Sequence, residues 1–150
     1  YMTYHRIKGE LMNLTLILRK ILTAILTTLV FSSMMSLYFM NQNYDFQFYF
    51  IAVGSVSLII IFFVGVPSSL IIEYIVNRLS ALKAVYKWSI QVGLYLFFGL
   101  ISSIVLLLQD ISDDYSKDFV TQIMIFGISA SFIFMLIDIV IKGIFKAFIK

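Results

Sequence analysis

The sequence predicts an all-α integral membrane protein, a bundle of four spanning helices with both chain ends on the same side. Four uncharged apolar runs, each 19 to 25 residues long, occur at residues 21–40, 48–72, 88–108 and 119–137. A helix of about 20 apolar residues crosses the ~30 Å hydrocarbon core of a bilayer. A hydrophobic content of 61% and a mean hydropathy of +1.01 agree with this interpretation, since spanning helices face lipid as well as each other.

The charges are sorted between the two sides of the predicted bundle. Ten of the eleven Lys and Arg residues lie before the first run, between the second and third runs, or after the fourth, whereas the other two connections hold one lysine and five aspartates. The positive-inside rule therefore places both termini and the middle connection in the cytoplasm. The basic pI of about 9.1 indicates contact with anionic headgroups at the inner face rather than with nucleic acid.

The polar segment 1–11 has two interpretations. The chain begins with Tyr1, and the codons of Lys8 to Met12 can contain a purine-rich ribosome-binding sequence before an ATG, so translation would start at Met12. The alternative is an ordinary cytoplasmic tail, mobile or at most an extension of the first helix. Either way we expect residues 12–150 to form one four-span domain, because the short connections leave no length for a soluble domain.

The first run carries small residues on one helical face. They recur every fourth position: Ala24, Thr28, Ser32 and Ser36. Such a stripe lets a neighbouring helix approach closely and gives its hydroxyls carbonyls to bond. Helix packing is the favoured interpretation, and a polar pore lining is the alternative.

Similar small pairs occur in each of the other runs. They are Gly65 with Ser69, Gly99 with Ser103, and Gly127 with Ser131. One tightly packed four-helix bundle explains all of them.

The second run contains the only proline of the chain, Pro67. Proline lacks the backbone donor that would bond the carbonyl of Phe63, and Ser68 and Ser69 offer hydroxyls that can satisfy backbone groups instead. We therefore expect a kink here.

After this run, the segment 77–87 has apolar and basic residues on opposite sides. This pattern predicts a short helix at the inner interface, anchored among headgroups. A specific lipid or protein partner for this helix is the alternative.

The third run spans residues 88–108, and the loop after it, 109–118, is acidic. This loop lacks the alternating ligands, the turn glycine and the closing glutamate of an EF-hand, so a solvated acidic loop is favoured over a calcium site. The fourth helix is expected to cover residues 119–141.

Two carboxylates, Glu73 and Asp138, stand at the cytoplasmic ends of apolar runs. Ionisable residues within spans are costly and therefore often functional. The favoured interpretation pairs each with a nearby base at the interface, Asp138 with Lys142 at i+4. In the alternative, Glu73 and Asp138 converge, with Lys142, on one inner polar site.

The sequence offers little for catalysis. There is no cysteine, and the lone histidine, His5, precludes a His-paired zinc site. No serine has a histidine or lysine beside it within a run. We therefore expect no enzymatic activity, no metal and no cofactor.

The order of features around the second run resembles a family of small uncharacterised membrane proteins of Gram-positive bacteria, some of them prophage-borne. It is carried by Gly65, Pro67, Ser69, Glu73, Arg78 and Lys83 within residues 12–150. The resemblance implies a multi-pass protein of the bacterial plasma membrane with an accessory role, and it implies no catalytic residues.

Three functional hypotheses follow. The leading one is a structural, regulatory or immunity-type interaction component that contacts itself or another membrane protein. The second is an oligomeric small transporter or channel, since four short spans enclose little volume alone. A phage-type membrane-permeabilising protein is the third.

Overall fold

The structure, a computed structural model, describes residues 2–40, 45–79, 83–109 and 117–148, without the side chains of 2–14, 106, 108, 109, 118 and 148. All of these residues are helical except Met40, Asp45, Leu79 and Lys83. Its elements are α1 (Met2–Phe39), α2 (Phe46–Ile60), the π-helical segment η1 (Ile61–Gly65), α3 (Val66–Arg78), α4 (Ala84–Gln109) and α5 (Lys117–Phe148). The segments α2, η1 and α3 form one continuous second span. Four helices are long and apolar enough to cross a membrane, Thr15–Phe39, Phe46–Arg78, Ala84–Val105 and Phe119–Ala147, which confirms the predicted fold class.

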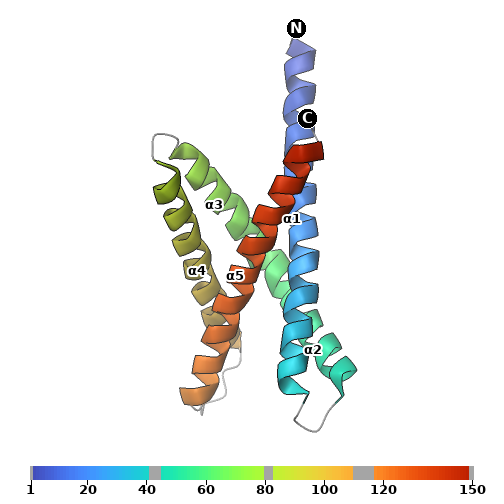
Figure 1. Cartoon of the computed structure of the whole chain (residues 1–150), viewed down its shortest axis with the longest axis vertical. Helices are drawn as coiled ribbons and strands as arrows, with labels where there is room; N and C mark the ends of the chain where they lie inside the picture. The colour runs from blue at the N-terminus through green and yellow to red at the C-terminus, as the bar shows by residue number, and fades with distance from the viewer. Residues whose placement is uncertain (1, 41–44, 80–82, 110–116, 149–150) are drawn as a thin grey trace.

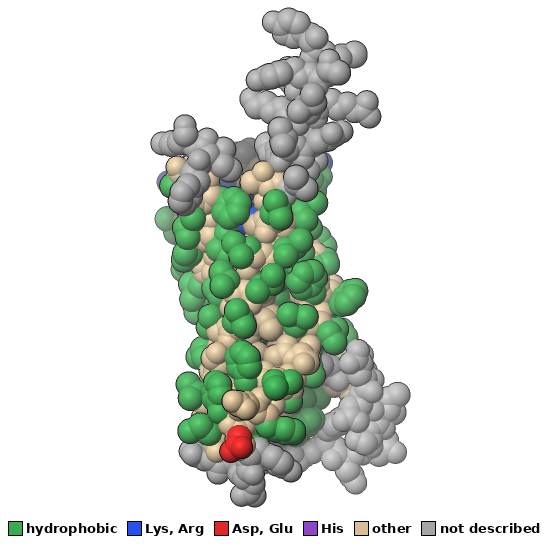
Figure 2. All heavy atoms as spheres, turned by 90° about the vertical axis from the view of Figure 1, so that its right-hand side faces the viewer, with side chains coloured by type: hydrophobic (Ala, Val, Ile, Leu, Met, Phe, Trp, Pro, Cys, Tyr) green, Lys and Arg blue, Asp and Glu red, His purple; other side chains and the backbone are tan. Residues whose placement is uncertain are grey.

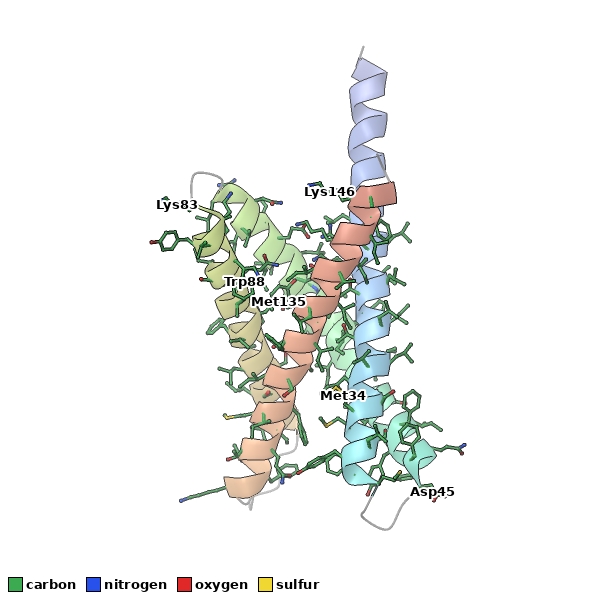
Figure 3. All side chains as sticks on the ribbon, viewed as in Figure 1. Met34, Asp45, Lys83, Trp88, Met135 and Lys146 are labelled. Carbon is green, nitrogen blue, oxygen red and sulfur yellow. The ribbon has the colours of Figure 1, made fainter. Side chains whose placement is uncertain are left out.

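The two ends of the bundle differ in charge. The start of α1, the end of α5, the end of α3 and the start of α4 lie at one end, and the other helix ends lie at the opposite end (Figure 1). Lys83 and Lys146 mark the first, which we call the basic end, and Asp45 marks the other (Figure 3). Figure 2 shows a face covered by hydrophobic side chains between the two ends. Backbone groups bonded within helices and an apolar exterior are what a bilayer requires.

The second span crosses the bundle. At its start α2 packs against α1, whereas at its end α3 packs against α4; α5 packs against both α1 and α4. Figure 1 shows α3 and α4 together on one side and α2 beside α1 on the other. The second span therefore changes neighbours between the two ends of the bundle.

The predicted small-residue stripe of α1 faces the interior. Ala24, Thr28, Ser32 and Ser36 are all buried. The hydroxyl of Thr28 donates to the carbonyl of Ala24 at 2.9 Å, and that of Ser36 donates to the carbonyl of Ser32 at 2.6 Å. These two hydroxyls are satisfied within their own helix. Ser32 Oγ, by contrast, is buried without a hydrogen-bond partner among the described residues.

A close helix crossing joins α4 and α5. A Cβ atom on Gly99 would lie 2.8 Å from the carbonyl oxygen of Gly127, and one on Gly127 would lie 2.7 Å from that of Gly99 and would overlap Ser103 Oγ. Ser103 Oγ lies 3.0 Å from the carbonyl oxygen of its own Gly99 and 3.2 Å from that of Ile123 on α5. Only glycine fits at both positions of this crossing.

The turn before Pro67 is π-helical rather than α-helical. Ser68 Oγ donates to the carbonyl of Val64 at 2.6 Å, and Ser69 Oγ donates to that of Val66 at 2.8 Å. Neither serine bonds the carbonyl of Phe63, the group that the missing N–H of Pro67 was expected to free. Prolines and π turns are both sites at which helices bend, and here the two adjoin each other.

Two expectations differ from the structure. No separate helix covers the described part of 77–87, because α3 continues to Arg78 and α4 already begins at Ala84. Gly65 does not sit at a close crossing: a Cβ there would have its nearest neighbours in Ile61 at 3.5 Å and Phe134 at 3.8 Å, which is ordinary contact.

Residues 2–11 belong to α1, and a start of translation at Met12 stays a prediction.

Candidate functional site

A cluster of charged side chains lies inside the bundle near the basic end. Every span contributes to it: the members are Arg19 and Lys20 of α1, Glu73 of α3, Tyr95 of α4, and Asp138 and Lys142 of α5. We call these six residues the ion-pair cluster. It holds three bases and two carboxylates.

Lys20 is the centre of the cluster. Its Nζ lies 2.7 Å from Asp138 Oδ2 and 3.1 Å from Glu73 Oε2, and its side chain is fully buried. Two carboxylates from different spans therefore share one ammonium group. Because charged hydrogen bonds strengthen where water is excluded, this triad joins α1, α3 and α5.

Arg19 lies beside Lys20 and contacts the same two carboxylates. Its guanidinium donates to Glu73 Oε2, and its Nε lies 3.6 Å from Asp138 Oδ1. These two atoms, Arg19 Nε and Asp138 Oδ1, are buried without a hydrogen-bond partner. Their separation lies just beyond hydrogen-bond length, so a small movement of either side chain would let Nε donate to Oδ1.

Lys142 and Tyr95 complete the cluster on opposite sides. Lys142 Nζ lies 3.2 Å from Glu73 Oε1, and its side chain is 54% exposed. The hydroxyl of Tyr95 donates to Asp138 Oδ2 at 3.4 Å, and its ring lies against Phe134, with 6.1 Å between the ring centroids. Lys142 thus connects the cluster to the surface, whereas Tyr95 extends it into the bundle.

The arrangement differs from the favoured interpretation of the carboxylates. Asp138 is buried, its ion pairs among the described residues are with Lys20 and Arg19, and Lys142 pairs with Glu73 instead of with Asp138 at i−4. The expected pair of Asp138 with Lys142 does not form because Asp138 faces α1. There it meets Arg19 and Lys20 at the same depth. Glu73 and Asp138 instead converge on one group, the ammonium of Lys20, as in the alternative of a shared inner polar site.

In the sequence Arg19 and Lys20 are two of the bases that precede the first apolar run, and no pattern singles out Tyr95. One signal was available for the first two. A carboxylate inside an apolar helix needs a counter-charge at its own depth, and Arg19 and Lys20 adjoin the first apolar run on the same side of the bundle as Glu73 and Asp138. Tyr95 carries no such signal, because a tyrosine within an apolar helix is unremarkable.

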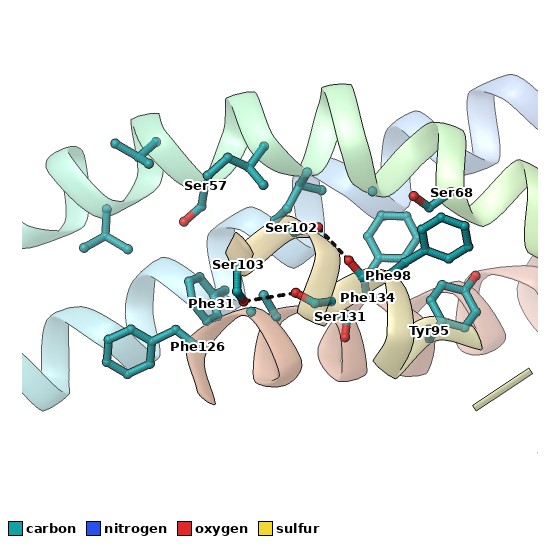
Figure 4. A pocket seen from close by; sticks show the side chains of 18 of the residues that line it. Phe31, Ser57, Ser68, Tyr95, Phe98, Ser102, Ser103, Phe126, Ser131 and Phe134 are labelled. Carbon is teal, nitrogen blue, oxygen red and sulfur yellow. Dashed lines mark hydrogen bonds between the residues drawn. The ribbon is translucent and has the colours of Figure 1, made fainter. Parts of the chain in front are cut away.

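A cavity of about 410 Å³ lies further from the basic end. Its walls come from all four spans, and Tyr95 is part of its lining as well as of the ion-pair cluster. Figure 4 shows Tyr95, Phe98 and Phe134 gathered at one end and Phe31 and Phe126 at the other. The cavity and the cluster are therefore neighbours along the bundle.

Within the part of the chain that the structure describes, no three His, Cys, Asp or Glu side chains gather to hold a metal ion. Most of the acidic loop weighed as a calcium site, residues 110–116, lies outside the described residues, and so does the side chain of His5.

The chain was compared with protein-family models, curated proteins and solved structures, and it matches none of them. The resemblance to small bacterial membrane proteins is therefore carried by sequence features alone. The four apolar spans and their packing identify a helical bundle of the multi-pass membrane type, without a family.

Proposed function

We propose that this chain is a non-catalytic component of a bacterial plasma membrane with a structural, regulatory or immunity-type role, acting through contacts of its helices with another membrane protein or a second copy. The observation that carries the proposal is the ion-pair cluster, whose charges are directed at one another. Lys20 is fully buried and the side chain of Asp138 is 5% exposed, so neither offers a group to a substrate. A buried network of this kind holds helices in one arrangement.

The proposal includes an orientation. Both termini lie at the basic end (Figure 1), and the positive-inside rule assigns this end to the cytoplasm. The exterior supports an interaction role as well, because large apolar side chains such as Phe63 and Val140 are 78% and 60% exposed and available to lipid or to another helix.

The test is site-specific photocrosslinking in native membranes. A photoreactive amino acid at Phe63 or Val140 should give a discrete adduct with one membrane protein or with a second copy, and the same residue at Asp45 should not. Diffuse lipid adducts at both positions, with no protein adduct at any exposed apolar site, would contradict an interaction role.

One observation favours a second candidate, an oligomeric transporter or channel. Glu73 and Asp138 converge on Lys20, and Tyr95 links that group to the cavity. Intramembrane carboxylates that share a cation are typical of proton and ion pathways.

The second candidate makes a separate prediction in vesicles. Vesicles that contain the purified protein should then show ion or proton flux that Glu73→Gln abolishes and that Asp45→Asn, at the opposite end, leaves intact. Flux equal to that of protein-free vesicles excludes this candidate.

A further inference from the structure

The cavity is a space that the crossing of the second span creates. One wall is α2 with η1, the other is formed by α4 and α5, and Phe31 of α1 lies with Phe126 at one end. Because α2 packs against α1 while α3 packs against α4, the second span separates from α4 near its middle. The π turn and the missing side chain of Gly65 lie on this same stretch.

The cavity lies at the depth of the lipid chains. Its lining on the second span runs from Ala52 to Ser68, the middle of the 33-residue span Phe46–Arg78. Two of these lining residues, Ala52 and Val56, are exposed, the latter to 53%, so the cavity opens along α2 on the outer surface of the bundle. The medium at this surface and depth is hydrocarbon.

The lining is chemically apolar despite its serines. Of the five serines that line the cavity, four donate their hydroxyl proton to carbonyls of their own helix, at 2.6 to 3.0 Å: Ser68, Ser102, Ser103 and Ser131. No charged side chain is among the described residues that line the cavity. A bound water needs two to four polar partners, and these walls offer few.

The volume suits a ligand larger than water. At about 410 Å³ the cavity exceeds the ~150 Å³ of an engineered apolar cavity that stays dry and binds benzene. Phe98, Phe126 and Phe134 supply flat apolar walls. An uncharged, elongated hydrocarbon group meets every one of these conditions.

We propose that the cavity is a lateral binding site for one hydrocarbon chain of a bilayer lipid, which enters between α2 and α4 and lies against Phe98, Phe126 and Ala130. The headgroup stays outside, since nothing charged lines the site. The bound chain fills the space that the crossing second span leaves and holds α2 apart from α4.

The test uses the full chain in phospholipid vesicles, in which the probe is phosphatidylcholine with a diazirine halfway along one acyl chain. After irradiation, mass spectrometry maps the adducts to residues. Phe98 lines the cavity and is half-buried, whereas its neighbour Phe97 is 58% exposed and does not line it. A bound chain should label Phe98 and Phe126 several-fold more than Phe97; labelling that follows exposure alone would overturn the proposal.

Two matched variants probe the entrance. Val56→Trp places a bulky ring at the rim, and Ile59→Trp places it on the same helix at a position that is 57% exposed and outside the lining. We expect Val56→Trp to reduce labelling of Phe98 several-fold and Ile59→Trp to leave it unchanged. Equal labelling in both variants would refute the site.

A third variant keeps the test decisive if Val56→Trp does not fold. Ala130→Phe fills the cavity from α5 and should displace the probe in the same way. Adducts between two protein copies in place of lipid adducts would assign the cavity to a helix of a second copy and overturn the proposal.

Discussion

Replacing Asp138 by asparagine removes one of the two carboxylates that face the Lys20 ammonium. Lys20 is fully buried, and Asp138 Oδ2 is its nearest counter-charge at 2.7 Å. Removing one partner of a buried ion pair costs about 3 to 5 kcal/mol, because the other charge is left without compensation. Glu73 Oε2 remains 3.1 Å from Lys20, so we expect the lower end of this range, about 3 kcal/mol.

The measurement is equilibrium unfolding of the purified protein in mixed micelles. A loss of about 3 kcal/mol lowers the folding equilibrium constant roughly 100-fold, since 1.4 kcal/mol corresponds to a factor of ten. The matched control is Lys142→Gln. The Lys142 side chain is 54% exposed, and an exposed ion pair contributes only about 0.2 to 1 kcal/mol.

A double variant separates pairing from packing. In Lys20→Met with Asp138→Leu both charges are absent, so stability should recover most of the loss, because apolar replacements of buried pairs are often neutral or stabilising. If Asp138→Asn costs no more than Lys142→Gln, the buried pair does not stabilise the fold and the reasoning fails.

Three further predictions concern other parts of the fold. Gly127→Ala should destabilise the bundle by about 1 to 3 kcal/mol through overpacking at the α4–α5 crossing, whereas Gly93→Ala, with nothing within 4 Å of the new Cβ, should be neutral or slightly stabilising in the same unfolding assay. Pro67→Ala restores a backbone donor and should replace the π turn by α-helix, so the distance between spin labels at the two ends of the second span should change; an unchanged distance would assign the turn to packing instead. Single cysteines from Asn43→Cys and Ser116→Cys should react with a membrane-impermeant thiol reagent in intact cells, and protection of both would reverse the orientation.

The number and the approximate place of the four spanning helices could be predicted from the sequence. A bilayer of fixed thickness demands apolar runs of fixed length, and the absence of water demands that each run be a helix. The same reasoning predicted the buried stripe of α1, because small residues at i and i+4 favour close approach of a neighbouring helix.

The small-residue pairs show where this reasoning ends. Gly99 and Gly127 lie at a helix crossing that only glycine fits, whereas Gly65, in the same kind of pair, lies beside a cavity. A pair of small residues indicates which face of a helix packs, but not which helix lies opposite it. The second span changes neighbours near its middle, so part of its packing face borders the cavity instead of a helix.

The ion-pair cluster was decided by the tertiary structure. The sequence determined that Glu73 and Asp138 stand near the basic end, and local spacing then suggested Lys142 as the partner of Asp138. The actual partner, Lys20, is 118 residues away in the chain. Whether two side chains from different spans meet depends on the rotation and depth of both helices, which are set by packing over their whole length, so only the assembled bundle selects the pair.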